Sequence, residues 1–294
     1  MRSENCAIVQ KSRNLLIQCL TVKRLGMSVL QKDKKLCCLS KLGILSFSGT
    51  DARAFLQGQI TLDAKLLDES GRLAAYCDAR GRVLATFILF KREDVFYAVT
   101  SKDLVSALVK RLRMYALRRD VKIDAVEGFT LYGDLGGVLV PANAEVIFTL
   151  PFGKILLSEE TLTTNAEEPE WWKVACENFF PWVFAATSSR FIAQSINLDL
   201  AGAISTDKGC YVGQEVISRI RNLGTPSRRL ALYTGPMETL TPGAEFYDCE
   251  KIPKGTLVYS SLGCALVESS RKEILDTLYT AEGTAFKLKC ETKE

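Results

Sequence analysis

The chain has 294 residues, of which 47% are hydrophobic, and a net charge of +4, so it can form one large domain or two to three smaller ones. Residues 1–41 contribute +7 to that charge, which leaves −3 for residues 42–294 and no overall electrostatic reason to bind nucleic acid. There is no histidine, which excludes Ser-His-Asp and Cys-His catalysis and the histidine-based zinc-protease motif.

No stretch of about 18 uninterrupted apolar residues occurs, so the sequence predicts no membrane-spanning helix. The ten cysteines are scattered without a Cys-x-x-Cys pair, which favours a reducing compartment and argues against a structural zinc site. We therefore expect a cytoplasmic protein without a resident metal. Residues 1–26 are basic and poor in acids, which leaves two alternatives: a presequence for the mitochondrial matrix, or a poorly ordered stretch before a second start at Met27.

The first part of the chain alternates strand and helix patterns. Apolar, β-prone runs predict strands over residues 43–48, 73–78, 82–90, 95–100 and 121–126. Thr50-Asp51 and Ser101-Lys102-Asp103 each precede a periodic apolar stretch, and so predict the starts of two helices. Strands interleaved with two helices in this order indicate a ferredoxin-like α+β unit.

The rest of the chain changes its pattern twice. Strands near 129–132 and 155–157 and a helix over 168–178 predict a second α+β unit that ends before Pro181. After Thr225-Pro226, short β-prone runs separated by glycine and proline predict a small terminal barrel or sandwich; these runs are 230–234, 255–260, 264–268 and 285–288.

One segment combines groups that suggest chemistry, and we call it the signature: Lys208-Gly209-Cys210-Tyr211-Val212-Gly213-Gln214-Glu215. Its thiol lies two residues from an ammonium group and just before a helix-like run, and both features favour a thiolate that can act as nucleophile or ligand. The alternative is a glycine-bordered turn with a buried, inert Cys210 and a solvent-facing Lys208. The residues alone leave both interpretations open.

The signature resembles the Lys-Gly-Cys-Tyr-x-Gly-Gln-Glu motif of the YgfZ family at every fixed position. The likeness covers the chain from about residue 40 to its C-terminus. Four further segments resemble family elements: Phe55-Leu56-Gln57-Gly58-Gln59-Ile60-Thr61, Asp78-Ala79-Arg80-Gly81-Arg82, Asn197-Leu198-Asp199 and Arg228-Arg229-Leu230.

The resemblance implies an α+β fold like that of the glycine-cleavage aminomethyltransferase, with three domains around a central folate-binding cavity. It divides the chain into an N-terminal extension (1–36), a ferredoxin-like folate-binding domain (37–127), a second α+β folate-binding domain with the signature loop (128–224) and a C-terminal β-barrel (225–294). The implied cofactor is tetrahydrofolate or a derivative. We expect the signature to lie in a loop that lines the central cleft.

The resemblance also implies roles for single residues. Trp171 would stack on the pterin and Glu177 would accept hydrogen bonds from it. Lys208 and Cys210 would form a catalytic pair in which the ammonium stabilises a thiolate. The remaining implied folate-binding residues belong to the signature: Gly209, Tyr211, Gly213, Gln214 and Glu215.

The implied function is that of a folate-binding accessory protein for iron–sulfur cluster assembly or repair, and through it for enzymes such as those that modify tRNA. Its expected partners are iron–sulfur proteins or their assembly factors, with no direct nucleic-acid or membrane contact, and we expect a monomer. The alternative is an aminomethyltransferase that moves a one-carbon unit from a lipoyl carrier to tetrahydrofolate. That enzyme carries a catalytic aspartate after the hairpin glycines, whereas residues 81–86 contain no acid, which disfavours the transferase.

Overall fold

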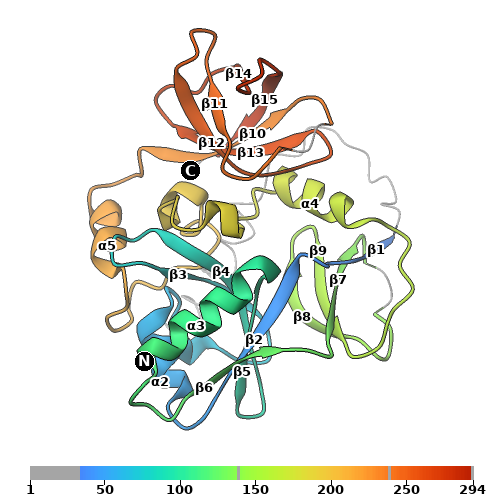
Figure 1. Ribbon diagram of the computed structural model, residues 1–294, viewed down its shortest axis with the longest axis vertical. Helices are drawn as coiled ribbons and strands as arrows, with labels where there is room; N and C mark the ends of the chain where they lie inside the picture. The colour runs from blue at the N-terminus through green and yellow to red at the C-terminus, as the bar shows by residue number, and fades with distance from the viewer. Residues whose placement is uncertain (1–33, 138–139, 238–239, 293–294) are drawn as a thin grey trace, which may run out of the picture.

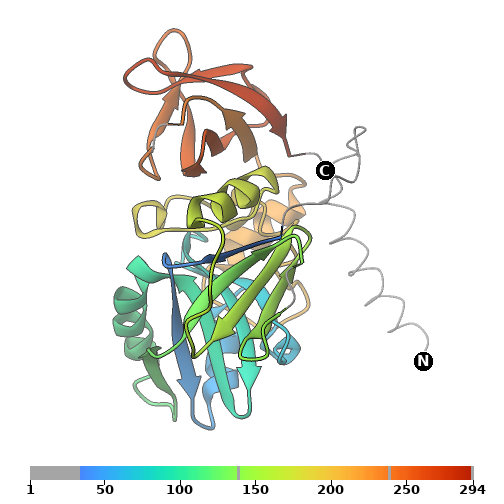
Figure 2. The same ribbon diagram turned by 90° about the vertical axis from the view of Figure 1, so that its right-hand side faces the viewer.

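A computed structural model of the chain describes residues 34–137, 140–237 and 240–292. The predicted N-terminal extension lies outside these residues apart from its last three positions, and the presequence and second-start alternatives lie wholly outside them. No helix of the described residues is long and apolar enough to cross a membrane. The described part consists of two antiparallel sheets beside each other, a layer of helix and loop above them, and a barrel on top (Figures 1 and 2).

The first sheet has the strand order β3-β4-β5-β2-β6. Within it, β6-β2-β5-β4 is the order of a ferredoxin-like unit, which confirms the predicted fold, and β3 adds an edge strand. Its elements are β2 (Leu42–Ser48), α2 (Ala52–Gln59), β3 (Arg72–Cys77), β4 (Val83–Arg92), β5 (Val95–Ser101), α3 (Val105–Tyr115) and β6 (Lys122–Val126).

The two faces of this sheet bury different cores, because side chains alternate along a strand. Leu45 and Phe47 on β2 point toward the face covered by α2 and α3, where they pack with Phe55 and Leu108. Ile44, the residue before Leu45, points to the other face and belongs to the central core that the rest of the molecule shares. Both faces of the first sheet are therefore covered. One face packs against α2 and α3, and the other packs against the central core.

The second sheet has the order β1-β7-β9-β8 and lies beside the first (Figure 1). Its strands are β1 (Lys35–Cys38), β7 (Thr130–Leu135), β8 (Glu145–Leu150) and β9 (Gly153–Ser158). β7 and β9 match the predicted strands. β1 pairs with β7, from Lys35 opposite Leu135 to Cys38 opposite Tyr132. The predicted boundaries place residues 37 and 38 in the first domain, but in the structure these residues contribute to the second sheet.

Helix α4 (Glu168–Glu177) separates the sheets from the barrel (Figure 2). It begins with a capping box in which Glu167 and Glu170 satisfy each other's backbone N–H groups, and Pro169 stands in its first turn. After α4 the chain runs through short 3₁₀ turns and then forms the next α-helix, α5 (Gln214–Asn222). α4 buries the indole rings of Trp171 and Trp172 toward the core.

The C-terminal residues form a closed barrel of order β10-β13-β12-β11-β14-β15, as predicted. Phe246 and Phe286 pack edge to face in its interior, which supplies the apolar filling that a small barrel needs. Its strands are β10 (Arg228–Thr234), β11 (Glu245–Tyr247), β12 (Pro253–Ser261), β13 (Cys264–Ser270), β14 (Thr277–Tyr279) and β15 (Ala285–Glu291).

Candidate functional site

The signature forms a loop over residues 208–213 followed by the first turn of α5. Gly213 begins the helix with a φ of 86°, a left-handed conformation that glycine adopts without strain. The side chain of Gln214 accepts a hydrogen bond from Tyr211 N at 3.3 Å. The predicted transition from loop to helix is therefore present, and the left-handed backbone at its start favours a glycine at position 213.

Lys208 is buried beneath this loop, with 9% of its surface exposed. Its Nζ donates hydrogen bonds to Ile60 O at 2.6 Å and to Leu62 O at 2.8 Å, and it lies 4.7 Å from the centre of the Tyr211 ring. Burial lowers the pKa of Lys208 to about 8, and Asp63 opposes that shift. Lys208 thus ties the signature to the chain segment after α2.

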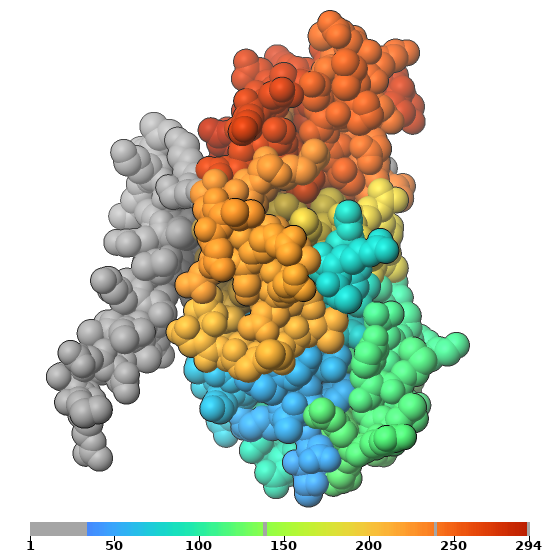
Figure 3. All heavy atoms as spheres, turned by 90° about the vertical axis from the view of Figure 1, so that its left-hand side faces the viewer, coloured from blue at the N-terminus to red at the C-terminus, as the bar shows by residue number. Residues whose placement is uncertain are grey.

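The signature also packs against the hairpin between β3 and β4. A Cβ added to Gly213 would lie 2.6 Å from Asp78 O, and one added to Gly81 would lie 3.0 Å from Cβ of Val216. Figure 3 shows the surface of the signature segment in orange, beside the hairpin in cyan and above the N-terminal elements in blue. Three segments that resemble family elements, far apart in the sequence, therefore meet here.

Cys210 is exposed at the outer surface of the loop, whereas Lys208 is buried. This arrangement reverses the turn interpretation, which expected a buried thiol and an exposed amine. Within the described residues, no hydrogen bond joins Lys208 to Cys210, because the ammonium is directed at the carbonyls of Ile60 and Leu62. The predicted catalytic pairing is therefore absent from this geometry.

The other signature residues have identifiable structural contacts. Burial raises the pKa of Tyr211 to about 12, with a smaller contribution from Cys77. Glu215 forms an exposed ion pair with Arg219 at 3.0 Å, and Gly209 is exposed. Their contact with folate, like that of Gly213 and Gln214, stays a prediction.

Trp171 and Glu177 are both on α4 but lie on different sides of it, because six residues correspond to a rotation of about 120°. The Trp171 ring is fully buried against Phe152, with ring centres 5.4 Å apart, and a Cβ on Gly133 would approach it to 2.4 Å. Glu177 instead accepts a hydrogen bond from Lys289 on the barrel at 3.0 Å. The structure does not bring these two predicted pterin contacts together.

Aromatic rings pack against one another in the central core of the molecule. Trp172 contacts Trp182, Phe184 and Tyr259 at centroid distances of 6.3, 5.3 and 5.6 Å. Trp182 is fixed by a hydrogen bond from Nε1 to Ser101 Oγ at 2.8 Å. The residues of this central aromatic cluster are Phe152, Trp171, Trp172, Phe180, Trp182, Phe184 and Tyr259. The folate contacts expected in this part of the molecule stay a prediction.

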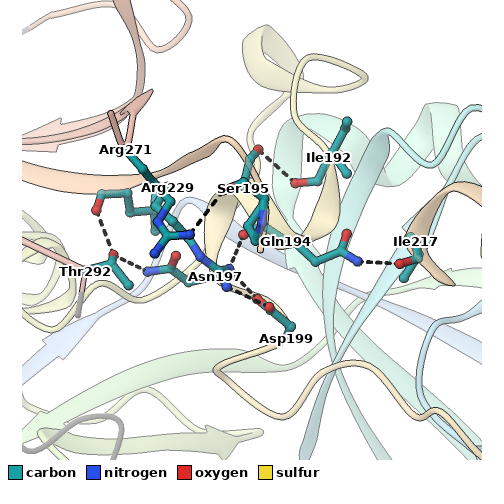
Figure 4. Close-up of polar contacts among 11 residues, drawn as sticks. Ile192, Gln194, Ser195, Asn197, Asp199, Ile217, Arg229, Arg271 and Thr292 are labelled. Carbon is teal, nitrogen blue, oxygen red and sulfur yellow. Dashed lines mark hydrogen bonds and ion pairs between the residues drawn. The ribbon is translucent and has the colours of Figure 1, made fainter. Parts of the chain in front are cut away.

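A polar network connects the segment before the signature to the barrel (Figure 4). Arg229 is 4% exposed and forms two bonds to Asp199, Nη1–Oδ1 at 2.6 Å and Nη2–Oδ2 at 2.9 Å. It also donates to Gln194 O, and Gln194 donates to Ile217 O of α5 at 2.6 Å. Arg229 and Asp199, both in segments that resemble family elements, therefore position the barrel relative to α5.

A cleft of about 630 Å³ opens between the hairpin, the C-terminal end of α5 and the barrel. We call it the arginine cleft, and its lining includes Arg82, Arg190, Phe191, Ile220, Arg228 and Glu268. No residue of the signature lines it, nor the smaller cleft on the barrel. Lining of a central cleft by the signature stays a prediction. In the structure its close contacts fix the hairpin and α5, and these two elements form walls of the arginine cleft.

Sequence reasoning missed two groups of this cleft, Arg190 and Glu268, because neither lies in a recognisable motif. Arg82 belongs to the hairpin segment named from the sequence, and its positive charge was the one signal in the sequence that could have pointed to this cleft.

Among the described residues, no group of three or more cysteine, aspartate or glutamate side chains could hold a metal ion. The exposed cysteines of the described part are Cys210 and Cys249.

Comparison with known proteins agrees with this architecture. No family model matches the chain. The tRNA-modifying protein YgfZ of Hamiltonella defensa is 31% identical over 231 residues, which cover 67% of this chain and 69% of that protein. The protein of the same name from Escherichia coli is 28% identical over 243 residues, 71% of this chain and 74% of that one.

The crystal structure of glycine cleavage system aminomethyltransferase T from Bartonella henselae aligns with a TM-score of 0.58 at 15% identity. The alignment covers 89% of this chain and 85% of that protein, so the two share a fold. The signature with its supporting segments, the shared fold and the identity to the Hamiltonella protein lead to one conclusion. The chain belongs to the YgfZ family.

Proposed function

We propose that this protein binds a tetrahydrofolate and supports the assembly or repair of iron–sulfur clusters in client enzymes, including enzymes that modify tRNA. The observation that carries the proposal is the intact signature, held in a fold that is shared with the folate-dependent aminomethyltransferase. The relatives' name, tRNA-modifying protein, supports a link to tRNA modification. Partners are then iron–sulfur proteins or their assembly factors.

The transferase alternative is disfavoured by the hairpin strand. Ala85 and Thr86 on β4, in the segment where the transferase has its aspartate, are buried. Thr86 Oγ1 accepts a hydrogen bond from Val183 N at 3.1 Å, so the hydroxyl is engaged with the protein. A group that orients reacting atoms has to face the substrate. We therefore assign the chain to an accessory role.

The exposed Cys210 is the group that a partner can reach. Its place at the start of the supported signature loop gives it a defined position without burying its sulfur. A cluster would be the cargo of a partner protein, to which Cys210 contributes one thiolate. Lys208 and Tyr211 hold the loop in which Cys210 stands.

A calorimetric titration with 5-formyltetrahydrofolate, a stable folate, tests the first half of this proposal. We expect saturable one-site binding by the purified protein. A glycine-cleavage assay on the same preparation is expected to show no aminomethyl transfer above background. Absence of folate binding would refute the folate part, and measurable transfer would establish the transferase alternative.

Complementation tests the second half. In cells that lack the protein, the Cys210→Ser variant is expected not to restore iron–sulfur-dependent tRNA modification, measured by mass spectrometry of tRNA nucleosides. Cys249→Ser is the matched control, because Cys249 is the other exposed thiol of the described residues, and it should restore modification fully. Equal rescue by both variants would remove Cys210 from the mechanism.

A further inference from the structure

Two arginines at the arginine cleft keep most of their donors available. Arg82 Nη1 donates to Arg190 O at 2.6 Å, and Arg190 Nη1 donates to Gly243 O at 2.8 Å. Both residues are exposed, and within the described residues neither forms an ion pair with a carboxylate. A guanidinium carries five N–H donors in a planar fork. These two side chains can therefore bind carboxylates in bidentate pairs.

Two glutamates lie on the barrel side of the same cleft. Glu245 is exposed, and the Glu268 side chain is 10% exposed and bonded to Arg228. Their carboxylates can accept N–H groups, whereas the phosphates of a nucleic acid would be repelled by them. An acidic peptide offers both complementary groups, carboxylates for the two arginines and main-chain N–H groups for the two glutamates. The cleft therefore fits an acidic peptide better than a nucleic acid.

The rim of the cleft also exposes apolar surface. Leu223, the residue that follows α5, is 80% exposed, and Ile220 lies one turn before it in the lining. Contact with an apolar side chain of a partner is favourable here, because it removes this surface from water. Arginine is also enriched at protein–protein interfaces relative to the rest of the surface. The combination of arginines and an exposed leucine indicates a protein segment as the occupant.

The cleft lies close to Cys210 along the same part of the chain. Cys210 precedes α5, and Leu223 follows it. The nine residues of this helix span about 13 Å. A specific interface covers about 800 Å² of each partner, a patch about 30 Å across. The signature segment, the hairpin and the barrel share one face of the molecule (Figure 3), so a protein that reaches Cys210 also covers the arginine cleft.

We propose that the arginine cleft binds an acidic, leucine-containing segment of the partner protein that reaches Cys210. The carboxylates of this segment bind Arg82 and Arg190, and its apolar side chain covers Leu223. Its main-chain N–H groups bind the two glutamates. The partner's identity as an iron–sulfur protein or assembly factor rests on the proposed function. The binding chemistry of the cleft depends neither on a cluster nor on folate.

Fluorescence anisotropy with two labelled peptides tests this chemistry. The probe is a fluorescein-labelled peptide of alternating leucine and glutamate, about eight residues long, which spans roughly 26 Å when extended. Its counterpart carries glutamine in place of glutamate. The full-length protein should bind the glutamate peptide at least about tenfold more tightly, because a charged hydrogen-bonded pair contributes at least this factor. In Arg82→Ala/Arg190→Ala the preference should fall to about one, and Leu223→Ser should weaken both peptides alike, by about tenfold.

The matched controls remove the same kinds of side chain elsewhere. Arg118→Ala/Arg119→Ala deletes two exposed arginines after α3, and Leu117→Ser deletes a leucine that is 84% exposed. None of these residues lines the cleft, so both controls should bind like the wild type. Arg82→Lys/Arg190→Lys keeps the charge without the planar fork and should retain only part of the preference. Circular dichroism and urea unfolding check that each variant is folded.

Complementation links the cleft to the partner. In cells that lack the protein, Arg82→Ala/Arg190→Ala should lower tRNA modification when it is expressed at the native level. Overexpression should restore it, because mass action compensates for weaker binding. The same overexpression should not rescue Cys210→Ser, which lacks the thiolate itself. Full modification by the arginine variant at the native level would overturn the role of the cleft in partner binding.

The peptide experiment can also overturn the proposal by itself. It fails if neither peptide binds, if the wild type binds both equally, or if Arg82→Ala/Arg190→Ala keeps the wild-type preference. Glutarate or a uridine oligonucleotide that binds more tightly than the glutamate peptide would assign the cleft to a small acid or to RNA instead. These results are separate from the proposed function. If Cys210→Ser restores tRNA modification while the peptide preference holds, the iron–sulfur role fails and the binding site stands.

Discussion

Replacing Arg229 with leucine is expected to lower the free energy of unfolding by about 3–5 kcal/mol, because it leaves a carboxylate without its partner in a largely buried site. Arg229 is 4% exposed and holds Asp199 through two bonds of 2.6 and 2.9 Å. It also satisfies Gln194 O, which would lose a donor. Equilibrium urea unfolding, followed by tryptophan fluorescence, measures the change.

Arg219→Leu is the control for this prediction. Arg219 pairs with Glu215 at 3.0 Å, but both side chains are largely exposed, so its loss should change stability by no more than about 0.5 kcal/mol. The double variant Arg229→Leu/Asp199→Leu should recover part of the loss, since it removes the uncompensated charge. Equal effects of Arg229→Leu and Arg219→Leu would contradict a structural role for the Arg229–Asp199 pair.

Lys208→Met is expected to destabilise the fold by about 2 kcal/mol at pH 7. The carbonyl oxygens of Ile60 and Leu62 lose their shared donor, and an unsatisfied buried acceptor costs about 1–3 kcal/mol. Relief from burying a charge offsets part of this. Cys210→Ser, two residues away and exposed, serves as the control and should leave the urea midpoint unchanged.

The same variant has a pH signature. Burial lowers the pKa of Lys208 to about 8 in the folded protein, against about 10.4 in an unfolded chain. Between these values the unfolded state binds more protons, so the Lys208 contribution to wild-type stability rises with pH. The stability difference between wild type and Lys208→Met should therefore grow from pH 8 to pH 10. A difference that stays constant over this range would show that burial does not shift the lysine.

Local patterns were sufficient for most secondary structure. Residues 43–48 alternate between two buried faces, and the strand β2 follows because both faces of its sheet are covered. Leu104, Leu108 and Leu112 recur at helical spacing and are buried, as a helix packed on the sheet requires. Met114, near the end of the same helix, is 59% exposed, because it lies beyond the stripe that these leucines define.

Strand β1 was missed for a different reason. Lys35–Cys38 is only four residues long, and its partner β7 begins more than ninety residues later. A short strand carries little periodicity, so its existence depends on the edge that is available for pairing. The barrel strands β11 and β14, each of three residues, were missed on the same grounds.

The amino-acid order was enough to establish the signature and most of the strands and helices, since these rest on neighbours along the chain. The closure of the barrel depends on pairing between strands that are far apart in the sequence, such as β10 with β15. Tertiary structure decided which signature side chain is buried. The acceptors of Lys208 are 148 and 146 residues away, and burial depends on such distant groups. For the same reason the burial of the Trp171 ring was decided by the tertiary structure, because Gly133 and Phe152 close around it. The arginine cleft likewise exists only where the hairpin, α5 and the barrel meet.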